Sequence, residues 1–327
     1  MTISTVKTFT EIDELEWDKF VKESPQGTIY GRYGYLSAVY GQWSSIITEE
    51  NGNWIAVLPF AIRKKYFFVY SFSPPFTQYL GMLFSKSGQT GRKEIEWKRS
   101  AIQNTIDVLP RELKLFNHNF SPVCDYLGPF YWSGYRVQVF QSFVLRLADT
   151  EQEVYNLFSS GIQESIAKSI RRGHTIIESD NLKPLIRLLR LNNLINPANE
   201  TILRNLWKYI STTNQGFILY AKDHDGNEVS GGLFLIDKDR VIFLSTATDP
   251  SSRSSGVHPQ LVWEGIKRAR NLQGVLLFDF EGSMIKGVDN YFNKFGAEPI
   301  FYFNVSRYRL GLIMRFVLAA VTGKPVY

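Results

Sequence analysis

The stretch that most constrains the fold is residues 245–305, in the final quarter of the chain. An apolar strand end leads into a Ser/Gly turn, which is followed by an amphipathic helix. A second apolar strand then ends on carboxylates and a glycine, and an aromatic-rich helix and a closing strand complete the stretch. A strand, glycine turn and helix in succession build a crevice with backbone N–H groups at its floor. We therefore expect the chemistry of the protein here.

The size and composition of the chain indicate a folded protein of two domains. It has 327 residues, of which 44% are hydrophobic and 21% charged, so a sizeable core is expected. The net charge of +6 favours acidic partners, such as phosphates, nucleotide tails, anionic glycans or an anionic membrane face. No basic run of the kind found in nucleic-acid arms occurs.

Several classes of protein are excluded by the residues that are scarce. Cys124 is the only cysteine, which rules out an internal disulfide and a thiolate-rich zinc site and fits a reducing compartment. The four histidines lack metal-ligand spacing, so no structural metal is expected.

The acidic N-terminus does not resemble a secretion signal, and the apolar run at 310–321 is too short to span a bilayer. We expect a cytoplasmic protein.

The order of predicted elements is similar in the two halves. In the first half, the patterns predict helices at 12–23, 32–40 and 93–109, a hairpin over 43–62 around Asn51-Gly52, and strands at 66–72, 77–84 and 112–116. In the second half, they predict a strand at 137–147, helices at 150–158, 160–172, 182–195 and 201–211, and strands at 216–221, 228–236 and 241–248. This is an α+β arrangement, with no repeat at the level of residues.

Four segments of the second half carry a resemblance to a known fold group. They read SGIQESIAKSIRRGH at 160–174, VSGG at 229–232, the turn and helix at 248–266, and DFEGS through FNKFGAEP within 278–302. In this order and spacing they resemble GNAT-type acyltransferases. The likeness is to the tandem-GNAT group, which includes the FemAB peptidoglycan aminoacyltransferases and the acyltransferases associated with polysaccharide synthesis (CelD-like).

This resemblance implies an α+β (mixed α/β) fold of two tandem GNAT-like domains, each a mostly antiparallel mixed sheet flanked by helices. A degenerate first domain is expected over 1–135 and a second domain, with the active cleft, over 136–306. Residues 307–327 are expected to form a basic amphipathic helix and tail. That helix either packs against the rest of the protein or lies on an anionic membrane surface.

A donor-binding turn is expected where the second domain has its Ser/Gly turn. By resemblance, it occupies the place of the pyrophosphate loop of a GNAT, at a helix N-terminus that favours anions. Its residues are Arg253, Ser254, Ser255, Gly256 and Val257. The alternative is an ordinary serine-capped helix start. His258 stands where a small residue is expected and would crowd a pyrophosphate.

Asp279 and Glu281 are the candidate catalytic residues, because an amine must lose a proton as it attacks an acyl carbon. Asp279 has an alternative role, in which it caps the following turn or pairs with a buried arginine. Ser283 is a candidate substrate contact or a helix N-cap.

The GNAT tyrosine that protonates a departing thiolate corresponds by position to Phe292. Its neighbour Tyr291, together with Lys294, is a candidate donor contact, although the aromatic stripe is also compatible with a core role. Lys168, Arg171 and Arg172 share one helix face that could hold a phosphate or a nucleotide sugar, the alternative being a solvated face.

Together these features predict an N-acyltransferase or aminoacyltransferase that acts on an amine of a cell-envelope or polysaccharide precursor. No tightly bound cofactor is expected. Acyl-CoA or aminoacyl-tRNA is the expected donor, and nucleic acid would be a partner only in the second case. The alternative is a catalytically inactive binding or scaffold protein with the same fold. The sequence is compatible with a monomer or a dimer, and with peripheral contact to the inner face of a membrane.

Overall fold

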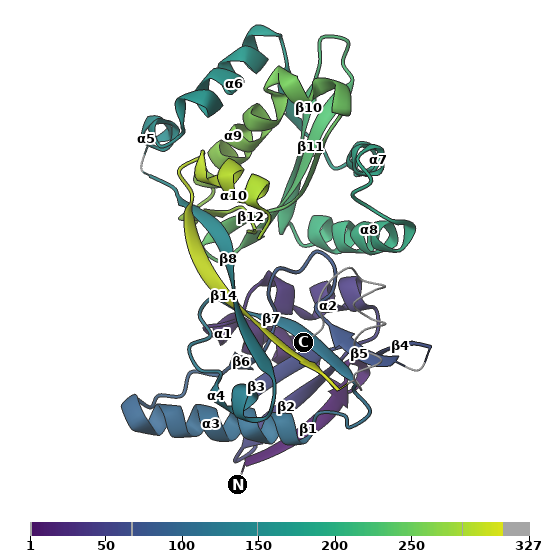
Figure 1. Ribbon diagram of the computed structural model, residues 1–327, viewed down its shortest axis with the longest axis vertical. Helices are drawn as coiled ribbons and strands as arrows, with labels where there is room; N and C mark the ends of the chain where they lie inside the picture. Colours follow the sequence, from purple (N-terminus) through teal and green to yellow (C-terminus); the bar gives the residue numbers. More distant parts are fainter. Residues whose placement is uncertain (1, 67, 149, 283, 310–327) are drawn as a thin grey trace. The chain divides into compact units, whose positions relative to one another are not determined.

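The computed structural model describes residues 2–66, 68–148, 150–282 and 284–309 (Figure 1). It divides into two compact units, one formed by Met1–Phe140 together with Phe301–Tyr327 and the other by Gln141–Ile300. The boundaries between the units fall within β8 (Arg136–Arg146) and β14 (Glu298–Tyr308), close to the expected domain limits at 135 and 306. From residue 310 on, the expected C-terminal helix lies outside the described residues.

Unit 1 contains two groups of strands. β1, β2, β3 and β6 form an antiparallel sheet in that order, and β4, β5, β7 and β14 follow one another in a second sheet. The elements of this unit are β1 (Thr2–Thr8), α1 (Glu14–Glu23), α2 (Tyr33–Tyr40), β2 (Ser44–Glu50), β3 (Asn53–Phe60), β4 (Arg63–Lys65), β5 (Phe68–Phe72), β6 (Leu83–Phe84), α3 (Gly91–Asp107), β7 (Leu115–Phe120) and α4 (Gly128–Trp132).

The hairpin predicted around Asn51-Gly52 is present as β2 and β3. Both turn residues have positive φ angles, 52° and 80°, as a tight two-residue turn requires. The sequence did not indicate β1, which has little hydrophobic alternation because it is an edge strand with mostly exposed side chains. The strand expected over 77–84 is reduced to Leu83–Phe84.

Unit 2 is built around one sheet, in which β12 and β13 run parallel and the other neighbours run antiparallel. The strand order is β8-β13-β12-β11-β10-β9. Its elements are α5 (Glu151–Asn156), α6 (Ser160–Arg171), β9 (Thr175–Glu178), α7 (Lys183–Leu191), α8 (Pro197–Thr212), β10 (Gly216–Lys222), β11 (Glu228–Asp237), β12 (Arg240–Thr248), the 3-10 helix η3 (Pro250–Ser255), α9 (Val257–Arg270), β13 (Leu277–Asp279) and α10 (Lys286–Asn293).

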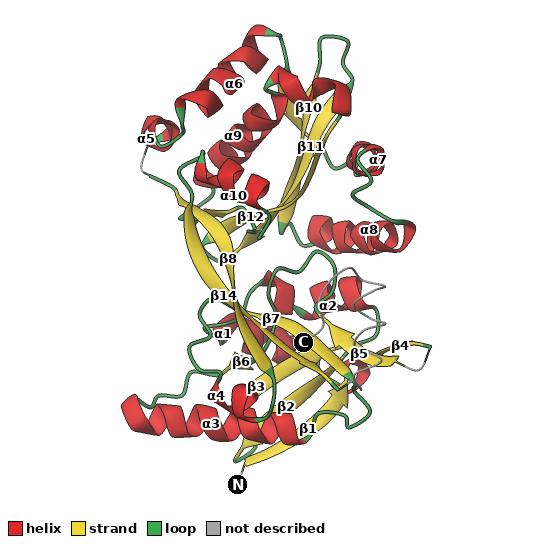
Figure 2. Ribbon diagram, viewed as in Figure 1, coloured by secondary structure: helices red, strands yellow, loops and turns green. Residues whose placement is uncertain are grey.

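Helices cover both faces of this sheet (Figure 2). α6 and α9 pack together on one face, where their apolar side chains join those of the strands in a single buried cluster. α7 and α8 contact the strands from the other face. The predicted mixed α/β fold is therefore confirmed. No helix among the described residues has the length and apolar character needed to cross a bilayer.

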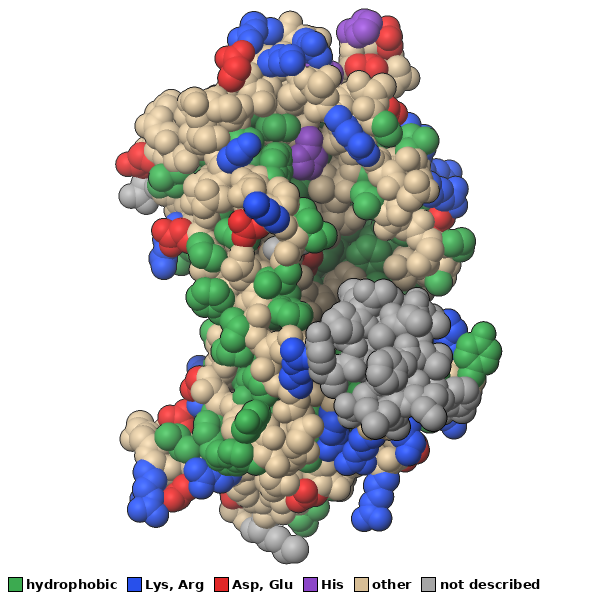
Figure 3. Space-filling model, viewed as in Figure 1, with side chains coloured by type: hydrophobic (Ala, Val, Ile, Leu, Met, Phe, Trp, Pro, Cys, Tyr) green, Lys and Arg blue, Asp and Glu red, His purple; other side chains and the backbone are tan. Residues whose placement is uncertain are grey.

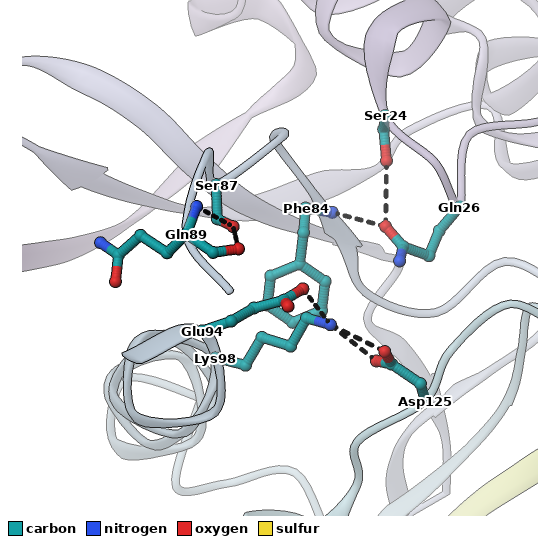
Figure 4. A network of polar contacts seen from close by, with 8 residues as sticks. All are labelled: Ser24, Gln26, Phe84, Ser87, Gln89, Glu94, Lys98 and Asp125. Atoms are coloured by element: carbon teal, nitrogen blue, oxygen red, sulfur yellow. Dashed lines mark hydrogen bonds and ion pairs between the residues drawn. The ribbon is translucent and has the colours of Figure 1, made fainter. Parts of the chain in front are cut away.

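A buried lysine fixes the long helix of unit 1 (Figure 4). The Lys98 ammonium on α3 lies 2.9 Å from a carboxylate oxygen of Glu94 and 2.8 Å from one of Asp125. Burial lowers the pKa of Lys98, but the hydrogen bonds and charges of the two carboxylates outweigh that effect, and the net pKa is raised. The ion pairs thus keep a nearly buried cation charged.

We expect the double variant Glu94→Gln/Asp125→Asn to lose about 1–3 kcal/mol of unfolding free energy, because it leaves the Lys98 charge without an anionic partner. Lys98→Met should cost less, since the carboxylate of Asp125 is well exposed and can be hydrated. Urea unfolding monitored by tryptophan fluorescence measures both. Equal losses in the two proteins would contradict this account.

Candidate functional site

The sheet of unit 2 opens where β12 parts from β13. Their parallel pairing ends at Ile242 and Asp279. The chain after β13 stays beside β8, where the N–H of Phe280 donates to the carbonyl of Phe143 at 2.9 Å. β12 instead continues beside β11 as far as Thr248. The last residues of β12 therefore leave the parallel pair and border an opening in the sheet.

Asp279 lies at the point of parting and is fully buried. Its carboxylate accepts hydrogen bonds from Ser142 Oγ at 3.2 Å and from the N–H of Glu281 at 2.9 Å, and it is 3.3 Å from the guanidinium of Arg240. These are the contacts of the structural role considered for Asp279, namely capping a turn and pairing with an arginine. A carboxylate with no exposed surface cannot meet an amine without a rearrangement.

Glu281 follows directly and is half-buried. Its φ angle is 49°, which is uncommon for a residue other than glycine and costs conformational energy. The next residue, Gly282, cannot be replaced, since a Cβ there would lie 2.1 Å from the Cα of Ser142. Ser283 lies outside the described residues. This tight turn places Glu281 directly after β13, where the sheet parts.

The expected donor-binding turn is formed by η3, Gly256 and the start of α9. Gly256 has φ 86° and ψ 2°, and a Cβ on it would lie 2.0 Å from the carbonyl oxygen of Ser165 on α6. Only glycine therefore allows α6 and this turn to touch through their backbones. The N–H of Val257 donates to Ser255 Oγ at 3.2 Å, so this donor is already used.

Two of the predicted basic residues meet at this turn. Lys168 Nζ on α6 donates to the carbonyl of Ser254 at 2.9 Å. The guanidinium of Arg253 donates to the side-chain oxygen of Asn192, whose amide in turn donates to the carbonyl of Thr248 at 2.9 Å. The structure thus brings Lys168 onto the turn formed by 253–257. Asn192 was not among the predicted site residues, because nothing in its sequence context marks it.

The other basic candidates are directed elsewhere. Arg171 forms an ion pair with Glu164 at 2.6 Å, and Arg172 is exposed at the end of α6. Lys294 is exposed after α10, and its carbonyl accepts a hydrogen bond from the N–H of Ser159. None of these three forms a hydrogen bond or ion pair with the turn at 253–257 within the described part of the chain.

A chain of hydrogen bonds connects α10, α9 and β12 at the opening. The hydroxyl of Tyr291 is 2.7 Å from His258 Nδ1, and His258 Nε2 is 3.1 Å from Thr246 Oγ1. Thr246 donates its own proton to the carbonyl of Gly231 at 2.9 Å. The threonine oxygen must therefore accept from Nε2–H, which leaves Nδ1 unprotonated as the acceptor for the tyrosine proton.

The surroundings of this chain favour neutral forms. Burial lowers the pKa of His258 to about 4 and raises that of Tyr291 above its ordinary value. At pH 7 the imidazole is thus a neutral proton acceptor beside a protonated phenol. His258, which the sequence suggested would obstruct a pyrophosphate, turns toward β12 instead.

Phe292, at the position of the GNAT tyrosine, lies in the core. Its ring packs 4.8 Å from that of Phe280 and 6.2 Å from that of Phe143, measured between centroids. The ring of Tyr291 packs against the same buried cluster, 5.2 Å from that of Phe295 between centroids, and its hydroxyl bonds to His258. Thr246 was missed at the sequence level, since its importance depends on the pairing of β12 and on the approach of α9.

Among the described residues, no group of three or more His, Cys, Asp and Glu side chains is arranged to hold a metal ion.

Comparisons with known proteins were made by sequence and by structure. No family model matches the sequence, and no curated protein matches it. Solved structures do match. The crystal structure of FemX superposes with a TM-score of 0.67 at 13% identity, covering 96% of this chain and 99% of that chain.

Two further structures show the same arrangement. L-PGS from Bacillus licheniformis has a TM-score of 0.55 at 12% identity, covering 94% of this chain and 96% of its own. A tandem GNAT protein from the clavulanic acid biosynthesis pathway has a TM-score of 0.53 at 8% identity, covering 95% and 99%.

The chain therefore has a tandem GNAT fold, as its sequence predicted. The fold of FemX is similar to that of this chain over nearly the whole of both chains.

Gly256→Ala tests how much the close backbone contact between α6 and the turn adds to the strain that a side chain causes at positive φ. We expect it to cost about 3 kcal/mol of unfolding free energy, because strain at φ 86° adds to overlap with the Ser165 carbonyl. The matched control is Gly226→Ala, with φ 82° and open space around the Cβ, which should cost only about 1–2 kcal/mol. Chemical unfolding measures the difference; equal costs would contradict it.

The lowered pKa of His258 predicts a pH dependence of stability. Between its ordinary value of 6.5 and about 4, the unfolded chain binds a proton that the folded chain does not. Unfolding free energy should therefore fall as pH falls through this window, by about 2 kcal/mol after allowance for partial exposure. His258→Asn should lose this component. His118, whose pKa burial lowers to about 3, remains in both proteins, so their difference isolates His258. Parallel stability curves would refute the prediction.

Proposed function

We propose that this protein is an acyltransferase or aminoacyltransferase that transfers its acyl group to an amine. The observation that carries the proposal is the chain Tyr291–His258–Thr246, which lies at the opening of β12 beside the turn at 253–257. It couples a phenol to a neutral imidazole beside the turn to which the resemblance to GNAT proteins assigns the donor. A scaffold protein with no reaction would not need such a chain.

The chain can move the proton that the reaction releases. As the amine nitrogen attacks the acyl carbon, its proton passes to the oxygen of Tyr291 while the phenolic proton moves to His258 Nδ1. The imidazolium so formed is held by the bond from Nε2–H to Thr246. When the bond from the acyl carbon to the sulfur or oxygen of the donor breaks, the proton returns through Tyr291 to that leaving atom. The products are an amide and a protonated leaving group.

β12 supplies a second feature that suits acyl transfer. Its register with β11 shifts between Leu233 and Phe234, so that Leu244 is an extra residue in the strand. Such a bulge removes a backbone N–H from the regular ladder. We assign to this bulge the contact with the developing oxyanion of the acyl group, which the resemblance to GNAT proteins implies.

We assign roles to four further predicted features of the site: Asp279, Glu281, the turn at 253–257 and Lys168. The buried ion pair of Asp279 positions the strands, and Glu281, strained and half-buried at the edge of the opening, orients the acceptor amine. The turn at 253–257 and Lys168 contact the donor. Two features of this turn limit its capacity for a pyrophosphate: the N–H of Val257 is used, and Pro259 has none. They favour an aminoacyl donor such as aminoacyl-tRNA over acyl-CoA.

The acceptor that we propose is an amine of a cell-envelope or polysaccharide precursor. The FemAB-like architecture and the resemblance in residues 160–302 support an envelope precursor. Reaction at the cytoplasmic side of the membrane, with peripheral contact to it, is part of the same proposal.

Tyr291→Phe tests the proposal, since it keeps the ring and removes the proton-carrying hydroxyl. We expect turnover to fall about 100-fold or more, while donor binding is retained. Donors are first found by thermal shift with acyl-CoAs, charged tRNA and nucleotide-linked sugars. Turnover is then measured with the donor that stabilises the protein.

Tyr155→Phe is the matched control, because Tyr155 lies in the same unit and its hydroxyl donates to a backbone carbonyl away from the opening. It should change turnover less than twofold. Full activity in Tyr291→Phe would exclude the relay. Stabilisation by none of the donors, with no turnover, would favour the scaffold function.

A further inference from the structure

A cavity of about 510 Å³ lies on α7 and α8 of unit 2, apart from the residues used above. Four of the side chains that line it are cationic and two are aliphatic: Lys183, Arg187, Arg190 and Arg204, with Ile186 and Leu191. On the side of unit 2 where these helices lie, Figure 3 shows Lys and Arg side chains beside hydrophobic ones. The cavity thus combines positive charge with an apolar wall.

The positive charge of the cavity is largely uncompensated. Arg190 and Arg204 share one carboxylate, that of Glu200, at 2.6 Å and 2.8 Å. Arg187 donates to a backbone carbonyl, that of Glu228, at 2.5 Å. Among the described residues, Glu200 is the one carboxylate in an ion pair with the cavity-lining cations. The charge of Asp249 also acts on Arg187, without an ion pair. Two carboxylates against four cations still leave a net positive field at the cavity.

Arginine binds oxyanions, and a phosphate offers more oxygens to several arginines than a single carboxylate does. Its planar guanidinium donates two parallel hydrogen bonds, and several arginines around one cavity match the oxygens of a phosphate ester. The aliphatic side chains of Ile186 and Leu191 offer a surface for the carbon skeleton to which the phosphate is attached. We propose that this cavity is a binding site for a phosphate ester.

The cavity is connected to the donor-binding turn through α7. Leu191, which lines the cavity, precedes Asn192, the residue that bonds to both Thr248 and Arg253. A phosphate ester bound on α7 would therefore sit on the same helix that holds the turn. Because that turn has few free backbone donors, a phosphate-bearing substrate needs cationic groups such as those of α7 and α8.

The test is isothermal titration calorimetry with two probes, sn-glycerol 3-phosphate and inorganic pyrophosphate, on the whole chain. Arg187→Gln/Arg190→Gln should weaken binding of the ester at least tenfold. The control Lys22→Gln/Lys208→Gln removes the same charge from exposed positions outside the cavity and should change affinity less than twofold. Thermal unfolding confirms that both variants fold.

Equal weakening in the two variants would show that only overall charge matters and would overturn the proposal, as would no binding by the wild type. Vesicles of phosphatidylglycerol and phosphatidylcholine distinguish the sources of the ester. Loss of vesicle binding in the cavity variant alone assigns the site to a lipid headgroup, and binding of the soluble ester alone assigns it to a free phosphate. Binding of RNA without either probe would overturn the proposal.

These measurements record binding and the acyl-transfer assay records turnover, so the failure of one proposal is distinguishable from the failure of the other. The cavity residues are not those of the proton relay.

Discussion

The buried carboxylate of Asp279 holds together the part of unit 2 on which the proposed site depends. It bonds to Arg240 on β12, to Ser142 on β8 and to the backbone after β13, and so joins three strands where the sheet begins to open. Removing one partner of such a buried pair leaves an uncompensated charge, which costs several kcal/mol. The contacts of Asp279 therefore fix the position at which β12 parts from β13.

Beyond Asp279, three polar side chains are joined by hydrogen bonds among apolar neighbours. Tyr291, His258 and Thr246 come from α10, α9 and β12, and each satisfies the next. The threonine proton fixes the tautomer of the imidazole, because its only donor is directed at a backbone carbonyl. Burial then keeps the imidazole neutral. The result is a neutral imidazole that accepts the hydrogen bond of the Tyr291 hydroxyl.

The backbone contact at Gly256 and the bonds of Asn192 connect three helices to the same turn. α6 approaches through Ser165, α7 through Asn192, and α9 begins at the turn itself. The positive charge of this unit lies in two places. Lys168 donates a hydrogen bond to the turn, whereas the arginines of α7 and α8 line a separate cavity. A substrate that carries both an acyl group and a phosphate would meet chemically different surfaces of one unit.

The sequence by itself determined the fold class, most helices of unit 2 and the place of the Ser/Gly turn before α9, since these depend on local periodicity, capping and glycine. The helix predicted at 150–158, for example, begins with a capping box formed by Thr150 and Glu153. Only the tertiary structure decided that Asp279 is engaged in an ion pair, that Phe292 is buried in the core while the hydroxyl of Tyr291 bonds to His258, and that His258 faces Thr246. These depend on strand register and helix packing between residues far apart in sequence, which no local pattern encodes.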